Sequence, residues 1–251
     1  MTKVIPWRFV NVGTVDSTQR VADEMATSGA LHGQVVVATR QVMGRGRFDR
    51  SWLSPEGGLY MSLVLRPSGE SDLRLLPLLG AFSVVEGITK KVGILSLVRW
   101  PNDVTITGKK VAGVIAESKF SGTGLSHVIL GIGINCNFGS VSLGSLGESS
   151  TTLSDQVGAP VDVDAVRDAT LESLASMYHD WEEGRAATIF ADRKSWFSTT
   201  GKTVEVEMLG GGGKITCRAQ EVMEDGSLVT TRADGSKLVM RGEEILRLRE
   251  L

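Results

Sequence analysis

The chain has few of the residues that staple a small protein or hold a metal. Its 251 residues include two cysteines and three histidines. Cys136 and Cys217 form no CxxC pair, which excludes a disulfide framework and fits a reducing compartment. His32, His127 and His179 lie far apart, and none has metal-ligand spacing to Cys, Asp or Glu. We therefore predict no protein-held metal and interpret the histidines as structural or surface residues.

Long apolar runs and an excess of one charge are also missing. The formal net charge is −2, which argues against nucleic-acid binding through bulk positive charge. No run of about 20 apolar residues occurs, so we predict no membrane span. Residues 1–10 lack the apolar segment and the small-residue cleavage site of a signal peptide. These absences predict a cytoplasmic protein.

The chain is long enough to bury a large core, as one domain or as two unequal ones. Its composition changes near residues 198–202. Before that point, strand patterns alternate with amphipathic helix patterns, such as residues 163–183. After it, short strands are separated by tight turns, including Asp225-Gly226 and Asp234-Gly235. We predict an α+β domain over residues 1–199, with a mixed β-sheet and flanking helices, and a small barrel over residues 200–251.

The most distinctive stretch is TRQVMGRGRFDRSW, residues 39–52, which follows a strand-like run. No helix or strand period passes through it. Gly44 and Gly46 allow a ligand to approach the backbone closely, and the forked cations of Arg45 and Arg47 suit carboxylate and phosphate. Two interpretations are open. The stretch is either a solvated surface loop or a lid that orders over an anionic ligand.

A second polar site lies at the start of a predicted helix. Asp16, Ser17 and Thr18 come before apolar residues at helical spacing, and Gly29 ends that pattern. Helix capping explains Ser17 and Thr18 on its own. Contact with a ligand is compatible with capping, because the free N–H groups and hydroxyls of a helix start form a polar pocket.

A predicted hairpin of two strands carries another pair of charged residues, Asp103 and Lys110, near its two ends. The strand ending at Trp100 stops at Pro101, and Asn102 with Asp103 marks a turn. Lys110 begins the next strand. A strand lysine is usually a solvated edge residue and Asp103 could be only a turn residue, so both also have a structural interpretation.

The strand over residues 127–136 carries Gly131 and Gly133 on one face, which often marks close approach of another group. The pair is not a dinucleotide fingerprint, because a third glycine and a following helix are absent. The sequence also lacks a P-loop and the Gly-x-Ser-x-Gly elbow of serine hydrolases.

Taken together, these stretches resemble the biotin protein ligases. Each motif is weak alone, but five of them occur in the order of that family and at about its spacing, and the match covers nearly the whole chain. The residues that carry it are Asp16-Ser17-Thr18, Gln41 with Gly44-Arg45-Gly46-Arg47 and Trp52, Arg99-Trp100-Pro101-Asn102-Asp103, Lys110-Val111-Ala112-Gly113, and Gly131-Ile132-Gly133-Ile134-Asn135.

The resemblance implies a class II aminoacyl-tRNA synthetase-like catalytic domain, an SH3-like C-terminal barrel and a two-step reaction. Biotin and ATP would form biotinyl-5′-AMP, with Mg²⁺ as cofactor, and biotin would then pass to a lysine of a biotin carboxyl carrier domain of an acyl-CoA carboxylase. The helix-turn-helix of repressor-type members is not seen, so no DNA binding is expected. A monomer and a homodimer both remain possible.

The resemblance also assigns roles to residues. It implies catalytic roles for Lys110, Arg45 and Asp103, with Asp103 assisting the acceptor lysine. The implied biotin contacts are Ser17, Thr18, Gln41, Gly44, Arg45, Arg47, Lys110, Gly131 and Gly133, the two last leaving room for a flat ring. The implied nucleotide contacts are Arg47, Trp52, Asn102, Lys110 and Asn135.

The chain departs from the pattern of the family at several positions. Asp49 replaces a loop glycine, Gln19 stands where Asn is common, and Arg99 replaces a lysine. Val42 and Met43 replace a Thr-Ala type pair. Two alternatives remain open: a lipoate- or octanoate-protein ligase or transferase of the same fold class, and a non-catalytic biotin-binding module. No role is assigned to Arg218, the barrel arginine near the position where the family often has a nucleotide contact.

Overall fold

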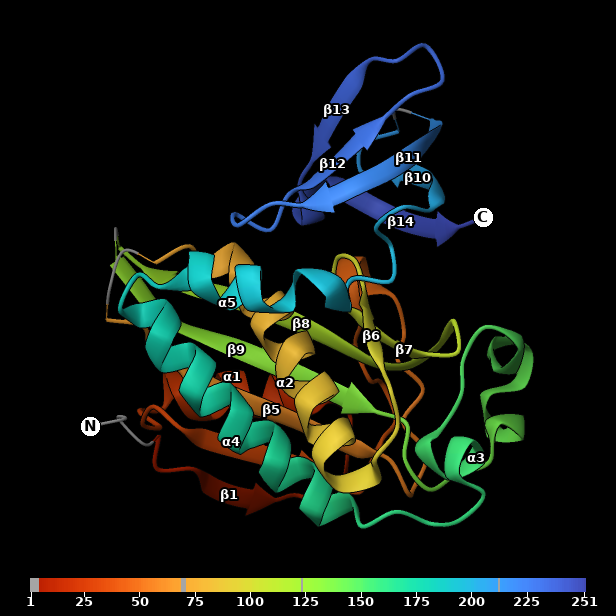
Figure 1. Cartoon of the computed structure of the whole chain (residues 1–251). Helices are drawn as coiled ribbons and strands as arrows, with labels where there is room; N and C mark the ends of the chain where they lie inside the picture. The colour runs from red at the N-terminus through yellow and green to blue at the C-terminus, as the bar shows by residue number, and fades with distance from the viewer. Residues whose placement is uncertain (1–4, 69–70, 123, 212) are drawn as a thin grey trace.

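The computed structural model describes residues 5–68, 71–122, 124–211 and 213–251. A seven-stranded mixed sheet forms the body of the protein, with strand order β1-β3-β5-β9-β8-β7-β6 (Figure 1). Strands β1 and β3 pair in parallel, and the other neighbours in this order are antiparallel. The strands are β1 (Arg8–Asn11), β3 (Gln34–Ala38), β5 (Leu59–Leu65), β6 (Leu97–Arg99), β7 (Asp103–Ile106), β8 (Lys109–Ser121) and β9 (Gly124–Ile134).

Helices cover both faces of this sheet. Helix α2 packs against one face with α4 and α5 outside it, and α1 packs against the opposite face (Figure 1). None of the helices in the described ranges is both long and apolar enough to cross a lipid bilayer. The helices are α1 (Thr18–Thr27), α2 (Leu76–Val92), α3 (Leu153–Val157), α4 (Val163–Glu182) and α5 (Ala186–Arg193), and the chain adds 3₁₀ turns at Arg47–Asp49, Leu73–Leu75, Ser140–Glu148, Lys194–Trp196 and Gly242–Glu244.

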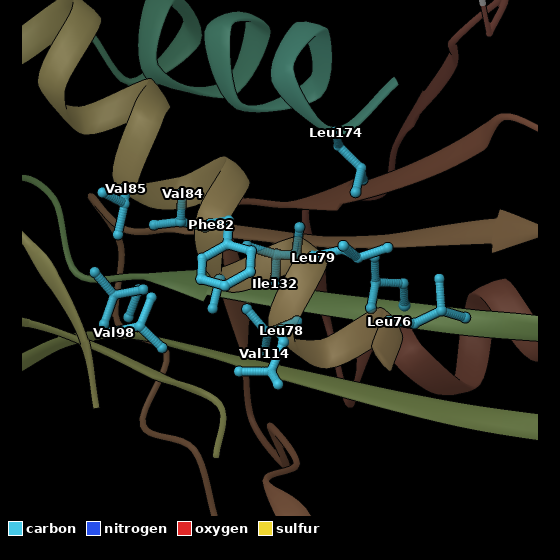
Figure 2. Close-up of a cluster of buried hydrophobic side chains, with 14 of the residues drawn as sticks. Leu76, Leu78, Leu79, Phe82, Val84, Val85, Val98, Val114, Ile132 and Leu174 are labelled. Atoms are coloured by element: carbon cyan, nitrogen blue, oxygen red, sulfur yellow. The ribbon is translucent and has the colours of Figure 1, made fainter. Parts of the chain in front are cut away.

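Alternation along the strands separates two hydrophobic clusters. Val36, Val64 and Ile129 pack with Ala22 and Ala26 of α1. Their strand neighbours point to the other face and join a larger core with α2 and α4 (Figure 2). Each large side chain buried there contributes about 1.5–3 kcal/mol to folding. The face of the sheet that α1 covers also carries Gly131 and Gly133, because these residues of β9 point to the same side as Ile129. The candidate site therefore lies on this face.

The chain turns sharply after the first strand. Gly13, with a φ of +61°, turns it out of the line of β1. The next two residues form β2 (Thr14–Val15), which pairs in parallel with β4 (Arg40–Gln41). The small β2–β4 sheet matters because it brings Gln41 next to the start of α1.

A five-stranded antiparallel sheet follows α5, in the order β13-β12-β11-β10-β14. This sheet is consistent with the predicted SH3-like barrel. It packs on the first sheet, since Trp100 Nε1 donates to the Gly226 carbonyl at 2.8 Å and both sheets share one hydrophobic cluster. The division at residue 200 stays a prediction. The strands are β10 (Thr203–Met208), β11 (Lys214–Val222), β12 (Leu228–Thr231), β13 (Lys237–Met240) and β14 (Ile245–Glu250).

Candidate active site

A cavity of about 660 Å³ lies on the α1 face of the large sheet. Strands β5, β8 and β9 form its floor, and the start of α1, residues 45–53, residues 143–150 and strand β14 surround it. Gly44 lies outside the lining. The cavity brings together the predicted residues Ser17, Thr18, Gln41, Arg45, Arg47, Trp52, Asn102, Asp103, Lys110, Gly131, Gly133 and Asn135.

Four uncharged side chains form a hydrogen-bonded group that we name the amide cluster: Thr18, Gln19, Gln41 and Ser62. Gln41 Oε1 accepts from the backbone N of Thr18 at 2.8 Å and lies 3.1 Å from Thr18 Oγ1. Ser62 Oγ lies 2.8 Å from Thr18 Oγ1 and 2.9 Å from Gln19 Oε1. Ser17 caps α1, accepting from the Gln19 N–H at 3.3 Å. Ser17 thus caps the helix and also lines the cavity.

The glycine-rich stretch folds into a tight hairpin. The Trp52 N–H donates to the Gly44 carbonyl at 2.8 Å, and the Gly46 N–H donates to the Arg50 carbonyl at 2.6 Å. A Cβ on Gly44 would lie 2.4 Å from the Trp52 carbonyl oxygen. Gly44 is therefore required for the hairpin to close, a structural role that sequence analysis had not separated from ligand contact.

The tip of the hairpin explains the unusual aspartate. Phe48 and Asp49 have φ values of +53° and +55°, in the left-handed region that favours glycine. Aspartate tolerates this region better than most residues. Its side chain is 92% exposed and lies 3.5 Å from Arg45, which also lies 3.8 Å from Glu117. Asp49 therefore fits the conformation that a glycine would supply there.

Arg47 turns toward the C-terminal sheet. Its Nη1 donates to Asn102 Oδ1 at 3.1 Å, and its Nη2 donates to the carbonyls of Ile245, at 2.9 Å, and Gly242. Burial, together with the charge of Arg50, lowers the pKa of Arg47 to about 10, which leaves it charged at neutral pH. In this structure Arg47 ties the loop to the barrel, and its predicted contact with biotin and nucleotide stays a prediction.

Trp52 occupies the space that the small residues of the floor leave open. A Cβ on Gly133 would lie 2.6 Å from Trp52 Nε1, and one on Gly113 would lie 3.2 Å from the same ring. Trp52 also packs against a cluster of Tyr60, Phe138 and Leu143. The flat ring that lies on Gly133 in this structure is thus the indole of Trp52, and a contact between Gly133 and biotin stays a prediction.

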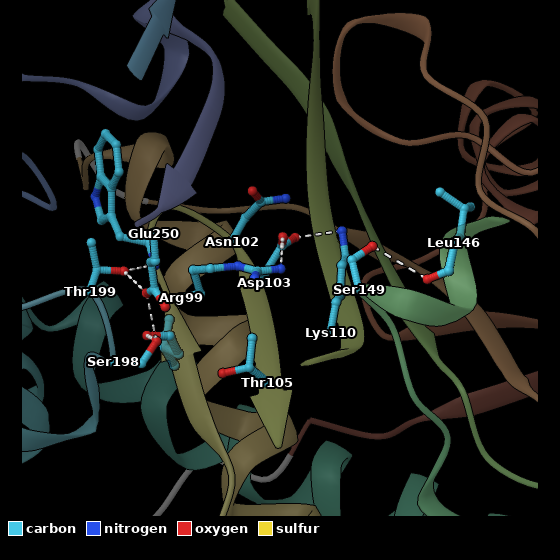
Figure 3. Close-up of polar contacts among 12 residues, drawn as sticks. Arg99, Asn102, Asp103, Thr105, Lys110, Leu146, Ser149, Ser198, Thr199 and Glu250 are labelled. Carbon is cyan, nitrogen blue, oxygen red and sulfur yellow. Dashed lines mark hydrogen bonds and ion pairs between the residues drawn. The ribbon is translucent and has the colours of Figure 1, made fainter. Parts of the chain in front are cut away.

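Charged residues of strands β6, β7 and β8 meet at the cavity. Lys110 Nζ lies 2.6 Å from Asp103 Oδ1, and Arg99 Nη2 lies 3.4 Å from Asp103 Oδ2 (Figure 3). Lys110 Nζ also lies 5.0 Å from the centre of the Trp52 ring. Burial raises the pKa of Asp103, but the charges of Lys110 and Arg99 outweigh it and hold the pKa below its usual value. Lys110 is thus a half-buried cavity residue and not a solvated edge lysine.

The two predicted nucleotide-binding asparagines are both held by the protein. Asn102 Nδ2 donates to the Val114 carbonyl at 2.7 Å, and its Oδ1 accepts from Arg47. Asn135 Nδ2 donates to the Thr151 carbonyl at 3.0 Å. These bonds fix the ends of β7 and β9. A contact between either amide and a nucleotide would require it to give up or share such a bond.

Several lining residues were missed. The segment 139–150 places Leu143 and Leu146 at the cavity, and a hydrogen bond from the Lys110 N–H to the Ser149 carbonyl at 2.9 Å holds it there. The sequence feature that could have identified this segment is a pair of leucines three residues apart in a Gly/Ser-rich run. Arg247 and Arg249 of β14 line the cavity as well, whereas Arg218 lines neither described cavity.

A second cavity of about 390 Å³ lies between the hairpin tip, the start of α2, strand β8 and the C-terminal sheet. Arg47 and Asn102 line both cavities, so the hydrogen bond between them forms part of the wall that separates the two. This wall depends on the barrel through the carbonyls that Arg47 binds.

Comparisons with known proteins agree with this arrangement. A family model described as the Biotin/lipoate A/B protein ligase family matches residues 12–135. The chain is 33% identical over 245 residues to the bifunctional ligase/repressor BirA of Bacillus subtilis, covering 95% of this chain and 74% of that protein. It is 29% identical over 242 residues to the biotin–[acetyl-CoA-carboxylase] ligase of Paracoccus denitrificans, covering 92% and 96%.

A solved structure, the biotin protein ligase from Aquifex aeolicus in complex with biotin and ATP, matches with a TM-score of 0.83 and 30% identity, covering 97% of this chain and 99% of that one. The mixed sheet, the small barrel and the cationic cavity define a ligase of the biotin/lipoate class. Within that class, the chain belongs to the biotin protein ligase family. The predicted fold class is confirmed.

Proposed function

We propose that this protein activates biotin with ATP and transfers it to one lysine of an acceptor protein. The observation that carries the proposal is that one cavity holds both an uncharged hydrogen-bonding cluster and a cationic group. The amide cluster suits the neutral ureido ring of biotin. Lys110 and Arg45 suit its carboxylate and the phosphates of ATP.

In the first step, a carboxylate oxygen of biotin forms a bond to the α-phosphorus of ATP, and the bond to pyrophosphate breaks. Biotin is already ionised at neutral pH, because carboxylates titrate at about 4 to 5. The step therefore needs no general base. It needs positive charge and alignment, which we assign to Lys110, Arg45 and Arg47.

In the second step, the lysine nitrogen bonds to the biotinyl carbon, AMP leaves, and one proton is released. A free lysine has a pKa near 10.4 and arrives as an ammonium ion. We assign Asp103 to that ammonium. Because the pKa of Asp103 is below its usual value, Asp103 is ionised and able to orient the ammonium, although it is a weak proton acceptor.

The expected Mg²⁺ does not fit a protein-held site. No three His, Cys, Asp or Glu side chains of the described residues form a metal-binding group. The carboxylates in the cavity, Asp103 and Glu250, are paired with Lys110 and Lys202 at 2.6 Å each. Mg²⁺ would therefore arrive as its complex with ATP, held by phosphate oxygens.

The remaining parts of the proposal concern partners and setting. The acceptor would be a biotin carboxyl carrier domain of an acyl-CoA carboxylase. The net charge of −2 supports a protein that does not bind DNA. A monomer and a homodimer are both compatible with the proposal. Cys136 and Cys217 are free and buried, which supports a reducing, cytoplasmic setting.

The direct test adds biotin, Mg-ATP and an apo carrier domain and measures the mass of the carrier. One added biotinyl group is expected. Exchange of labelled pyrophosphate into ATP should require biotin. Exchange that responds to lipoate and not to biotin would instead support the lipoate alternative, and binding of biotin without exchange would support a non-catalytic module.

A further inference from the structure

Backbone groups fix both glutamine side chains of the amide cluster. Gln19 Nε2 donates to the Ile129 carbonyl at 3.1 Å, and a carbonyl can only accept, so Gln19 Oε1 must face Ser62. Gln41 Oε1 accepts from the Thr18 backbone N–H, which can only donate. Two amide oxygens, both acceptors, therefore stand at the two ends of the hydroxyl pair formed by Thr18 and Ser62.

This arrangement dictates where the two hydroxyl protons point. The chain of oxygens runs Gln41, Thr18, Ser62, Gln19, with gaps of 3.1, 2.8 and 2.9 Å. Gln41 Oε1 already has a donor in the Thr18 backbone. The buried Gln19 Oε1 has Ser62 as its donor, and a buried acceptor without a donor costs about 1–3 kcal/mol. Every acceptor is satisfied when Thr18 donates to Ser62 and Ser62 donates to Gln19.

This order determines what Thr18 offers to the cavity. Its proton is used inside the cluster, and no hydroxyl donates to it, so its oxygen presents lone pairs only. If Gln19 did not accept from Ser62, the Ser62 proton would turn to Thr18 Oγ1 and occupy one of those lone pairs. Gln19 therefore controls the hydrogen-bonding character of Thr18 by accepting the proton of Ser62.

The sheet beneath the cluster is shaped to hold Gln19 in this position. Gln19 is 3% exposed. A Cβ on Gly131 would lie 2.6 Å from Gln19 Oε1, so only glycine at position 131 leaves room for the amide. Gly131 thus accommodates the Gln19 amide in this structure, and its contact with biotin stays a prediction.

We propose that Gln19 is a positioning residue that makes this part of the cavity an acceptor site, which selects a ligand whose head group donates N–H. The inference rests on the proposed function and deepens it. The ureido ring of biotin carries two N–H groups, whereas the dithiolane ring of lipoate has none and would leave a buried acceptor unpaired. Gln19 would then help to distinguish two cofactors that share a pentanoate tail.

The test is pyrophosphate exchange at varied biotin concentration. Gln19→Met keeps the length of the side chain and removes its amide. The KM for biotin should rise about tenfold with kcat within about twofold, since one hydrogen bond to the ligand is weakened. The preference for biotin over lipoate should fall by a similar factor. Gln34→Met, on the surface of β3, is the matched control and should change neither value.

A second variant distinguishes an effect of hydroxyl orientation in Thr18 and Ser62 from a packing defect. In Gln19→Met/Ser62→Ala no hydroxyl remains to donate to Thr18, so its lone pairs are free again. The KM for biotin should return to within about threefold of the unsubstituted protein. A double variant that is worse than Gln19→Met, or a Gln19→Met protein with unchanged KM and preference, would overturn the inference. Absence of biotin-dependent exchange in the unsubstituted protein would instead overturn the proposed function.

Discussion

The amide cluster and the charged residues of the same cavity differ in burial and in the partners that hold their side chains. In the amide cluster, Thr18, Gln19 and Ser62 are buried, and the two glutamine amides are oriented by backbone groups. The charged group consists of Arg45, Arg47, Asp103 and Lys110. Lys110 and Arg45 are held by ion pairs, with side chains that are 26% and 44% exposed.

This difference follows from what each group has to bind. A neutral ring is recognised by fixed donors and acceptors, and an error there leaves a polar group unpaired in a buried site. Phosphate and carboxylate bring charges of their own, so a lysine or arginine can exchange a protein carboxylate for a ligand oxygen. The amide cluster is therefore preorganised, and the charged group is held by partners that it can exchange.

The largest effect is expected from Lys110→Ala, which removes the central cation. Biotin-dependent pyrophosphate exchange should fall a hundredfold or more, about 3 kcal/mol, because charge on the transferring phosphoryl group loses its partner. Lys109→Ala, an exposed neighbour, is the control. The melting temperature of Lys110→Ala should fall by a few degrees, about 2–4 °C per kcal/mol, because Asp103 loses its partner at 2.6 Å, whereas that of Lys109→Ala should stay near the value of the unsubstituted protein. Near-normal exchange in Lys110→Ala would reduce Lys110 to a structural role.

Thr18→Val tests the role of the preorganised amide cluster. The side chain keeps its shape and loses the oxygen that links Gln41 and Ser62. We expect the KM for biotin to rise roughly thirtyfold, about 2 kcal/mol, with a smaller change in kcat, because the contact serves ground state and transition state alike. Thr27→Val, at the exposed end of α1, should behave normally. A fall in kcat alone would show that the amide cluster acts in chemistry and not in recognition.

Arg47→Ala removes the member of the charged group that binds backbone carbonyls of the barrel. The wall between the two cavities should open, and biotinyl-AMP should escape more easily than from the unsubstituted protein, by roughly tenfold if about one to two hydrogen bonds hold the wall closed. Biotin on lysines of a bystander protein, measured by mass, reports the escape. Equal escape in Arg45→Ala would assign the effect to loss of loop charge and not to the contact with the barrel.

The charged group could be predicted from the sequence because its residues lie in the motifs that resemble those of the biotin protein ligases. Arg45, Arg47, Asp103 and Lys110 all stood out, and all four line the cavity. Their partners could not be predicted. That Arg47 binds the carbonyls of Ile245 and Gly242 depends on how two sheets pack across nearly 200 positions of sequence, which no local pattern encodes.

In the amide cluster, the sequence did not identify Ser62 or Gln19 as site residues. Ser62 is one polar residue in an apolar strand, and Gln19 was seen only as a departure from the pattern of a family. The function of either depends on the register of β5 with β9, which sets Ser62 opposite Gly131. The fold itself was more accessible, since long periodic elements such as α2 and α4 and the short strands of the barrel follow directly from hydrophobic spacing.

Asp103→Asn measures how much the ion pairs of Asp103 with Lys110 and Arg99 stabilise the fold. The pKa of Asp103 is below its usual value, so its charge stabilises the folded protein at pH values above the unfolded pKa of about 3.9 and loses this effect as pH falls below it. At pH 7 the variant should lose about 1–2 kcal/mol in urea unfolding. The difference should shrink below about pH 4. A difference that is constant with pH would mean that shape and not charge is responsible.

The smallest effect is expected at Asp49, the departure that most altered the glycine-rich motif. Its side chain is almost fully exposed, and an exposed ion pair such as that with Arg45 contributes about 0–1 kcal/mol. Asp49→Gly removes this pair and eases the left-handed backbone, but it also gives the unfolded chain more freedom. The two backbone effects oppose each other, so the rate of trypsin cleavage after Arg45, Arg47 or Arg50 should change by only about twofold.

A second substitution, Asp49→Asn, separates charge from conformation because asparagine also tolerates positive φ. If the ion pair holds the hairpin, Asn and Gly should speed cleavage equally. If backbone conformation dominates, Asn should match the unsubstituted protein. In all three proteins, biotin should slow cleavage, and biotinyl-AMP should slow it further, since each ligand favours the closed loop. A hairpin that is cut equally fast with and without saturating ligand in all three would show that this loop, unlike the amide cluster, takes no part in holding the ligand.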